Sequence, residues 1–383
     1  MFINSVELKN FKNYEDLKLD LASNKILLIG KNAQGKTNLL EAIYYLSSLT
    51  PLRSQTDKEL IQWNKDFASL RLNMTKNDVE INLETVINPP NKKKNSVNGV
   101  KKTKLQDFIS NLSAVSFSVN DLLLLRGTPD DRRKWLDCAI LQVYPAYSER
   151  LSKYNKIRIQ KNNYLKELKG NLNSDTSLLD IWNEQLAVTG SNIIYIRLNF
   201  LREMQAIAGE KHSKISDSED LTIKYITKIF DDISFENIPS TKEILDKFSE
   251  KLVEKKQEEI IRAQSVVGPH RDDIEFYING INSVKFASQG QQRTIVLALK
   301  LSELEIIQSK TGDSAVLLLD DVLAELDDLR QNYLLNAIGE NIQTIITSVD
   351  TLHFKEEYLR NVKIYKISTD ENNCAKCEEL INQ

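Results

Sequence analysis

The stretch ILLIGKNAQGKT, residues 26–37, decides the fold class of this 383-residue chain. Its apolar start is typical of a buried parallel strand, and residues 30–37 match the pattern GxxxxGK[ST] without a mismatch. Downstream, Leu39, Leu40, Ile43 and Leu46 recur at helical spacing. A strand, a glycine-rich loop and a helix in this order form a phosphate-binding P-loop, so the sequence predicts an α/β fold.

The P-loop residues suit a nucleoside triphosphate. Glycines let the backbone fold closely around the phosphates, and the N–H groups at the helix N-terminus then face the anion. Lys36 is expected to neutralise the β- and γ-phosphates, and the Thr37 hydroxyl to ligate Mg²⁺. A chance match is the alternative, but both flanking elements are present. The predicted nucleotide-binding residues are Gly30, Lys31, Asn32, Ala33, Gln34, Gly35, Lys36 and Thr37.

A second apolar strand ends in two acids, in the stretch LLLDD at residues 317–321. Asp320 is expected to hold Mg²⁺ through water, and Asp321 to polarise the attacking water. Alone this pattern is weak, because buried strands often end in aspartate; together with the P-loop it is strong. The sequence therefore predicts Lys36, Asp320 and Asp321 as catalytic, with Thr37 and Asp320 as metal ligands.

The pattern of apolar residues divides the rest of the chain into three parts. Residues 68–74 and 79–87 alternate with period two, which indicates antiparallel strands, and Asn98-Gly99 and Asn279-Gly280 are hairpin signals. From residue 131 apolar positions recur every three or four residues, with a strand expected only at 221–226, and glycines such as Gly209 are expected to interrupt any long coiled coil. We therefore predict half a nucleotide-binding lobe in residues 1–127, an inserted helical lobe in 128–265 and the second half in 266–383.

The stretch SQGQQR, residues 288–293, opens a helix ahead of the acidic strand. A serine and a glycine at a helix start favour an anion. Because the P-loop already holds the phosphates, this second site is more useful on the γ-phosphate of another subunit. Ser288, Gly290 and Gln291 are therefore candidate nucleotide-binding residues. The alternative is an ordinary capping box between Ser288 and Gln291.

Together these motifs resemble the ABC-type ATPase heads of the SMC and Rad50 kind, and most closely the bacterial RecF family of recombination mediators. The resemblance covers essentially the whole chain. It is carried by VELKNFKNY (6–14), TPDDRR (128–133), GPHRDD (268–273), SQGQQRT (288–294) and DDVLAELD (320–327).

The resemblance implies a mixed sheet plus an antiparallel β subdomain, with an inserted helical lobe. It implies ATP and Mg²⁺ as cofactors, a homodimer driven by ATP in which Ser288 and Gly290 act in trans, and Asp327 at the dimer seam. It further implies a weak, DNA-stimulated ATPase in the cytoplasm that clamps duplex DNA and single-strand/duplex junctions during replication, recombinational gap repair and the SOS response. RecR- and RecO-type mediators are the implied partners. Residues 116–120 lack the glutamine of a Q-loop, and Ser348 replaces a switch histidine, which suggests slow hydrolysis.

The distribution of charged residues does not decide which side chains would contact DNA. Lys and Arg number 51 against 54 Asp and Glu, a net charge of −3, which excludes a wholly basic coat protein but not a local patch. Arg132 and Arg133 could equally pair with acids of the helical lobe, and His270 and Arg271 could form a hairpin base or sense nucleotide. The hairpin around Asn98-Gly99 carries a further ambiguous set, whose side chains could contact the phosphates of a DNA backbone or simply be solvated: Lys92, Lys93, Lys94, Lys101, Lys102 and Lys104.

Other classes fit less well. No apolar run reaches the roughly 18 residues of a membrane span, and three cysteines with three histidines give the Cys374–Cys377 pair no expected zinc site. A reducing cytosol is the expected compartment. A transporter ATPase subunit would share the three motifs, but the helical lobe is too long for one. A structural SMC-like protein would need heptad arms, which we do not find.

Overall fold

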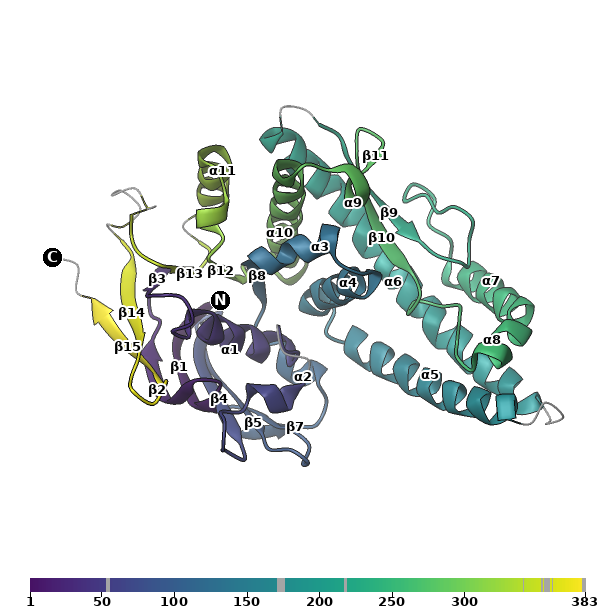
Figure 1. Cartoon of the computed structure of the whole chain (residues 1–383), viewed down its shortest axis with the longest axis horizontal. Coiled ribbons are helices and arrows are strands. Elements are labelled where there is room, and N and C mark those ends of the chain that lie inside the picture. The colour runs from purple at the N-terminus through teal and green to yellow at the C-terminus, as the bar shows by residue number, and fades with distance from the viewer. Residues whose placement is uncertain are drawn as a thin grey trace. The chain divides into compact units, whose positions relative to one another are not determined.

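The computed structural model describes residues 1–383 except 53–55, 171–175, 217–218, 340, 353, 355–358, 360 and 381–383 (Figure 1). The described chain forms two compact units: unit 1 contains residues 1–121 and 300–383, and unit 2 contains residues 122–299. The sequence placed the divisions elsewhere, after residues 127 and 265. Residues 266–299 fall in unit 2 because they supply strand β10 (Asp273–Ile278), which pairs antiparallel with β9 (Leu221–Ile226) of the helical region.

The first sheet of unit 1 is antiparallel throughout. The period-two segments become its central strands, with apolar side chains buried on alternate positions of β4. The Asn98-Gly99 turn joins its last two strands, and both turn residues have positive φ, of 50° and 75°. In spatial order the strands are β2 (Tyr14–Asp20), β1 (Phe2–Phe11), β4 (Ala68–Lys76), β5 (Val79–Ile87), β6 (Lys94–Val97) and β7 (Val100–Lys102).

The second sheet of unit 1 is parallel except at one edge. Its central strands β12 and β13 are buried at every position, as the continuous apolar runs predicted. The antiparallel edge strand β15, which holds Cys377, was not predicted, because its sequence AKCEEL lacks a strand pattern. In spatial order the strands are β15 (Ala375–Leu380), β14 (Lys363–Thr369), β3 (Lys25–Ile29), β13 (Thr344–Ser348), β12 (Val316–Asp320) and β8 (Ala114–Ser118).

Helix α1 (Lys36–Ser48) contacts strands of both sheets and buries most of its residues. Among the described residues, the other helices that lie wholly in unit 1 are shorter: η1 (Asp57–Leu60), α2 (Gln106–Ile109), η3 (Leu323–Glu325) and α11 (Asp328–Ile338). A 3₁₀ turn, η2 (Val119–Leu122), and the long helix α10 (Gln289–Thr311) each run from one unit into the other. Within the described residues no helix is long and apolar enough to cross a membrane.

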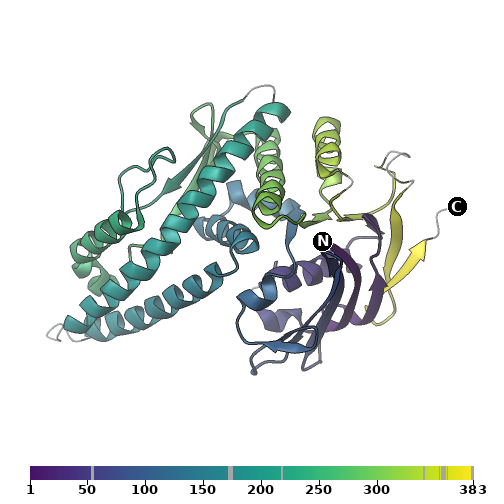
Figure 2. The same cartoon turned by 180° about the vertical axis from the view of Figure 1, so that it is seen from behind.

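Unit 2 is built on two long helices, α5 (Tyr147–Gly170) and α6 (Ser177–Ile215), which lie side by side (Figure 2). Contrary to expectation, α6 continues through Gly209 for 39 residues. Gly190 also lies inside α6, where an added Cβ would lie 2.6 Å from the Phe248 ring, so glycine permits close packing there. The remaining elements are α3 (Leu123–Arg126), α4 (Pro129–Val143), α7 (Thr241–Glu254), α8 (Lys256–Arg262), β11 (Ile281–Asn282) and α9 (Ser283–Phe286).

Candidate nucleotide-binding site

The P-loop joins the end of β3 to the start of α1, as the sequence predicts. Both of its glycines have conformations and surroundings that other residues would not tolerate. Gly30 has a φ of 156°, and an added Cβ would lie 2.2 Å from the Ile367 carbonyl oxygen. Gly35 has a φ of 113°, and its Cβ would lie 2.8 Å from the Asn13 amide. Glycine at both positions therefore lets the loop pack closely against β14 and the β1–β2 turn.

The Lys36 ammonium is buried beneath the loop, with 3% of the residue exposed. It donates to the carbonyl oxygens of Gly30 at 2.6 Å and Lys31 at 3.2 Å. Both of these partners are uncharged, so they hold the ammonium in place without neutralising it. The arrangement suits an anion bound within the loop.

The order of the strands brings together Thr37 and Asp320, which are 283 residues apart in the sequence. Because β3, β13 and β12 are neighbouring parallel strands, their carboxyl ends meet at one edge. There the Thr37 hydroxyl donates to Asp320 Oδ1 at 2.7 Å. A hydroxyl and a carboxylate oxygen at this distance are ligands that Mg²⁺ accepts, with phosphate oxygens and water completing its shell.

Thr347, at the end of β13, orients both acids and was missed by the sequence analysis. Its hydroxyl donates to Asp320 Oδ1 at 3.0 Å and accepts from the Asp321 backbone N–H at 2.9 Å. Asp321 has a φ of 54°, in the left-handed region. Its carboxylate is therefore carried on a turn that Thr347 holds, directly after the strand that positions Asp320.

Two other segments brace the loop. Asn13, in the β1–β2 turn, donates to the Gln34 carbonyl at 3.1 Å, and the Tyr14 hydroxyl donates to that of Gly35 at 3.1 Å. The Gln34 side chain accepts from the Thr369 N–H at 2.6 Å and from its hydroxyl at 2.9 Å. Gln34 thus acts as a brace to β14, a role that no local sequence pattern indicates.

The SQGQQR stretch lies in unit 2 and forms the capping box that was the alternative interpretation. The Ser288 N–H donates to Gln291 Oε1 at 2.9 Å, and the Gln291 N–H donates to Ser288 Oγ at 3.2 Å. Gln291 Nε2 also donates to Glu219 at 2.8 Å. Ser288 remains exposed and Gly290 is half-buried. The cap and an anion-binding role are compatible, because the helix start still faces solvent.

Two other ambiguous sets have structural partners within unit 2. Arg132 forms a two-pronged ion pair with Asp273, at 2.7 and 2.8 Å, and Arg133 bonds to Asp130 and the Asp272 carbonyl. His270 bonds to the Tyr154 hydroxyl at 2.7 Å.

Burial lowers the pKa of His270 from 6.5 to about 3, so the ring is neutral. Its contacts therefore favour the structural interpretation, as a hairpin base. Ser348, which stands in place of a switch histidine, is buried, and its carbonyl accepts from the Gly30 N–H at 3.3 Å.

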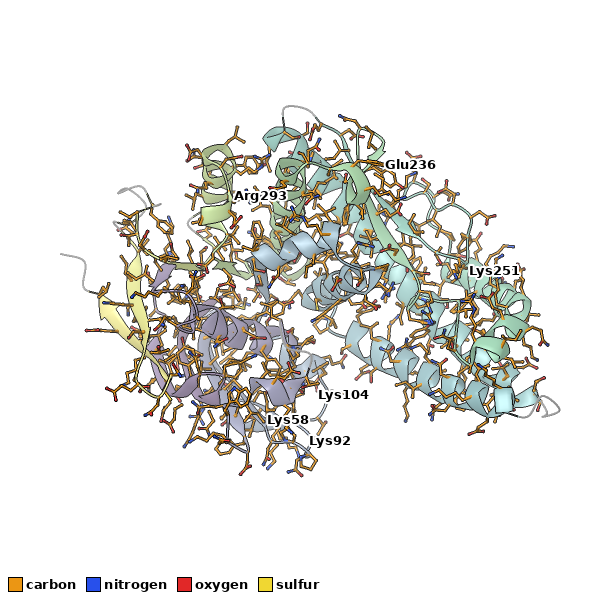
Figure 3. The ribbon with its side chains drawn as sticks, viewed as in Figure 1. Lys58, Lys92, Lys104, Glu236, Lys251 and Arg293 are labelled. Carbon is orange, nitrogen blue, oxygen red and sulfur yellow. The ribbon has the colours of Figure 1, made fainter. Side chains whose placement is uncertain are left out.

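The basic residues around the β6–β7 hairpin are not equivalent. Lys93 is engaged: its ammonium pairs with Asp57 at 3.1 Å, donates to the Leu49 carbonyl and lies over the Tyr45 ring. The others are exposed or half-buried, and Figure 3 shows Lys92 and Lys104 on the same side of unit 1 as Lys58. The positions suited to a polyanion are Lys92, Lys94, Lys101, Lys102 and Lys104.

The cysteines form no metal centre in the part of the chain that the structure describes. No group of three or more His, Cys, Asp or Glu side chains there could hold a metal. Cys374 and Cys377 are both free thiols, at the β14–β15 turn and within β15. Burial raises the pKa of Cys377 to about 12, so its thiol is protonated and unreactive.

The fold and the P-loop site define an ABC-type ATPase of the RecF/RecN/SMC N-terminal-domain family, whose model matches residues 2–376, and the chain belongs to that family. Its relatives include RecF proteins. The DNA replication and repair proteins RecF of Bacillus thuringiensis strain Al Hakam and Bacillus cereus strain B4264 are each 39% identical to it over 379 residues, covering 99% of both chains.

Comparison with solved structures supports the same family. A structure of the recombination mediator protein RecF with ATP, in the RecFOR pathway, superposes with a TM-score of 0.89 at 32% identity, covering 99% of this chain and 98% of that one. An Smc head bound to the C-terminal winged-helix domain of ScpA superposes with a TM-score of 0.52 at 15% identity, which shows a shared fold.

Proposed function

We propose that this chain is an ATP-dependent DNA-binding clamp that acts in DNA replication and in the recombinational repair of single-strand gaps. The observation that carries the proposal is the 2.7 Å approach of Thr37 to Asp320 beside a complete P-loop. The RecF names of the relatives and the ATP in a solved relative support the same activity.

Each residue of the site has a task in ATP binding and hydrolysis. Residues 30–37 wrap the phosphates, and Lys36 neutralises their charge. Thr37 and Asp320 would hold Mg²⁺, which neutralises charge on the phosphate oxygens. Asp321 would polarise the attacking water, and Thr347 keeps the Asp321 backbone in position.

The proposed active form is a homodimer with two ATP molecules at its interface. Ser288, Gly290 and Gln291 of one chain would face the γ-phosphate bound by the other chain, because a helix start that is open to solvent favours an anion. Asp327, which caps α11 by accepting from the Arg330 N–H at 2.9 Å, would lie at the seam. ATP binding closes this dimer and slow hydrolysis reopens it.

The closed dimer would bind duplex DNA and single-strand/duplex junctions without reading sequence. The basic side chains of the β6–β7 hairpin are candidates for phosphate contacts. RecR- and RecO-type mediators would join the clamp in the cytoplasm, as the RecFOR pathway named for the solved relative suggests.

The test is ATP hydrolysis with and without gapped duplex DNA. We expect a low rate that DNA raises, and no response in the Asp321→Asn variant. A rate that DNA leaves unchanged, with no ATP-dependent DNA binding, would contradict the clamp and favour a transporter-type ATPase subunit.

A further inference from the structure

Glu219 is a half-buried acid of unit 2 that none of the tasks proposed above uses. It lies between the end of α6 and the start of β9. Its Oε1 accepts a hydrogen bond from Gln291 Nε2 at 2.8 Å. Because Gln291 is one of the residues proposed to face the nucleotide of the other chain, this contact joins Glu219 to the proposed ATP site.

The backbone around Glu219 is held by other parts of unit 2. His212, a fully buried residue in the last turn of α6, has its Nδ1 3.3 Å from the Glu219 carbonyl oxygen. Ser216 Oγ donates to the His212 carbonyl at 2.7 Å and lies 3.2 Å from the same Nδ1, so the ring proton belongs on Nδ1. In the β10–β11 turn, Asn279 accepts from the Asp220 N–H and donates to the Asp220 carbonyl, both at 2.9 Å. The Glu219 carboxylate therefore extends from a backbone that hydrogen bonds hold on both sides.

The contact with Glu219 fixes the orientation of the Gln291 amide. A carboxylate can only accept hydrogen bonds, so Gln291 must turn its NH₂ group towards Glu219. The amide oxygen then faces the Ser288 N–H, which donates to it at 2.9 Å. The reverse orientation would set two acceptors against each other at Glu219 and two donors against each other at Ser288. Glu219 thus holds the capping box closed.

The closed capping box leaves the Ser288 hydroxyl able to donate a hydrogen bond. Ser288 Oγ accepts from the Gln291 N–H at 3.2 Å, and a hydroxyl that accepts keeps its own proton for another partner. Among the described residues, Ser288 Oγ donates to no other group. Ser288 is exposed, so a phosphate oxygen, which is an acceptor, can reach this proton.

We propose that Glu219 is a positioning residue of the site formed between two chains: it orients Gln291, and through the capping box it presents the Ser288 hydroxyl to the γ-phosphate held by the other chain. This inference rests on the proposed homodimer. Glu219 acts through its accepting oxygen and not through its charge, because a negative charge beside a bound phosphate is unfavourable. A glutamine at position 219 also has an accepting oxygen and should therefore replace it.

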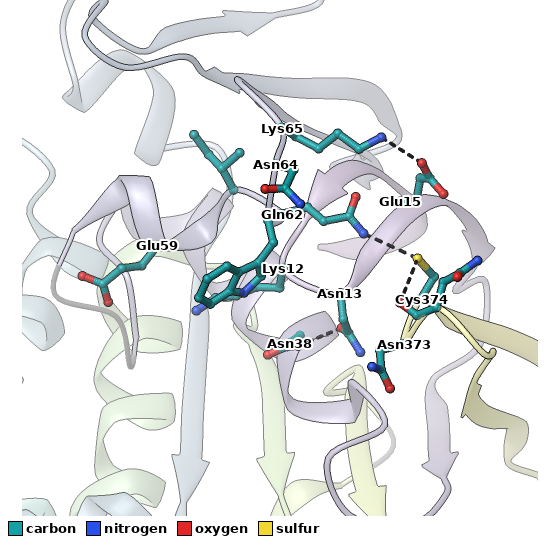
Figure 4. A pocket seen from close by; sticks show the side chains of 13 residues that line it. Lys12, Asn13, Glu15, Asn38, Glu59, Gln62, Asn64, Lys65, Asn373 and Cys374 are labelled. Carbon is teal, nitrogen blue, oxygen red and sulfur yellow. Dashed lines mark hydrogen bonds and ion pairs between the residues drawn. The ribbon is translucent and has the colours of Figure 1, made fainter.

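The experiment measures the dimer dissociation constant of the full chain at saturating ATP, by sedimentation equilibrium. Glu219→Ala should raise this constant about fivefold or more, because a hydrogen bond to a charged group is lost, whereas Glu219→Gln should stay within about twofold of the wild type. ATP binding to the single chain should not change, because the P-loop and its neighbours Asn13 and Asn38 belong to unit 1 (Figure 4). Glu210→Ala, which removes an acid of α6 paired with Lys214, is the matched control and should dimerise like the wild type.

A double variant separates positioning from a general loss of structure. Because Glu219 is proposed to act through Gln291, Glu219→Ala combined with Gln291→Ala should dimerise no more weakly than Gln291→Ala alone. Three results would overturn the inference: additive losses, an unchanged dimer in Glu219→Ala, or a Glu219→Gln variant as weak as Glu219→Ala.

A wild-type chain that stays monomeric with ATP would instead overturn the proposed function. Amide hydrogen exchange on the nucleotide-free chain tests the Glu219 contact independently of the dimer. Glu219→Ala, but not Glu219→Gln, should speed exchange across residues 288–291, because the capping box opens more often. Equal exchange in the wild type and Glu219→Ala would contradict the positioning role.

Discussion

Lys36 and Asp321 have different tasks in the proposed site, so their variants should separate binding from turnover. Lys36→Met removes the buried ammonium and should weaken ATP binding about tenfold or more, since a hydrogen bond to a charged group contributes roughly 1.5–3 kcal/mol. Asp321→Asn should preserve binding and hold the dimer closed, because the water is no longer activated. An equilibrium titration with ATP measures the binding affinity of each variant. Asp321→Asn binding no better than Lys36→Met would show that the tasks are wrongly assigned.

Because His270 is a buried, neutral ring, we expect the free energy of unfolding to depend on pH. Its folded pKa is lowered from 6.5 to about 3 by burial, so below pH 6.5 the unfolded chain binds a proton that the folded chain does not. His270 therefore contributes stability above pH 6.5 that is lost as the pH falls towards 3, by up to about 1.4 kcal/mol per pH unit.

Urea unfolding at pH 7 and pH 5 measures this dependence. His270→Gln removes the titrating ring and should lose less stability between the two values than the wild type. A steeper loss in the variant would mean that His270 is not a neutral, buried ring.

At this scale the sequence predicted the residues whose spacing forms a motif, from Gly30 to Thr37 and at Asp320 and Asp321. It did not predict Thr347, Asn13 or Thr369. Their roles depend on hydrogen bonds between segments distant in the chain, such as Thr369 to Gln34, and such bonds leave no local pattern.

Among the elements, the β6–β7 hairpin is the candidate DNA-binding element. Replacing Lys94, Lys101, Lys102 and Lys104 with Gln should flatten the plot of log K against log salt for duplex DNA, by about 0.9 for each phosphate that the variant no longer neutralises. Binding titrations over a range of salt concentrations measure the slope. ATP-driven dimerisation should not change.

Lys93→Gln is the matched control for the hairpin. Lys93 is already paired with Asp57, so its loss should leave the salt slope unaltered. A slope that stays the same in the fourfold variant would place the DNA contacts elsewhere and leave the hairpin as a solvated loop.

Element types were predictable where the period was long and regular, as in β4, β5 and the helices of unit 2. The continuity of α6 was not, because a glycine within a helical pattern usually indicates a break. Gly209 was expected to give such a break, yet α6 runs through it to Ile215. Strand β15 escaped prediction because it is an exposed edge strand, held by pairing with β14 rather than by an apolar pattern.

At the scale of the whole molecule, the division into units was the least predictable feature. Residues 273–278 look like any short strand, and only their pairing with β9 places them in unit 2. The division assigns the P-loop to unit 1 and the start of α10 to unit 2. The central claim is that ATP joins these two surfaces from different chains.

Analytical ultracentrifugation of the full chain with ATP, with ADP and without nucleotide tests that claim most directly. We predict dimers with ATP and monomers otherwise, and we expect Ser288→Arg to bind ATP normally but to stay monomeric. Ser240→Arg, which breaks the same kind of capping box at the start of α7, is the matched control and should dimerise like the wild type. Equal dimer populations with ATP and ADP, or a Ser288→Arg variant that dimerises normally, would contradict the claim.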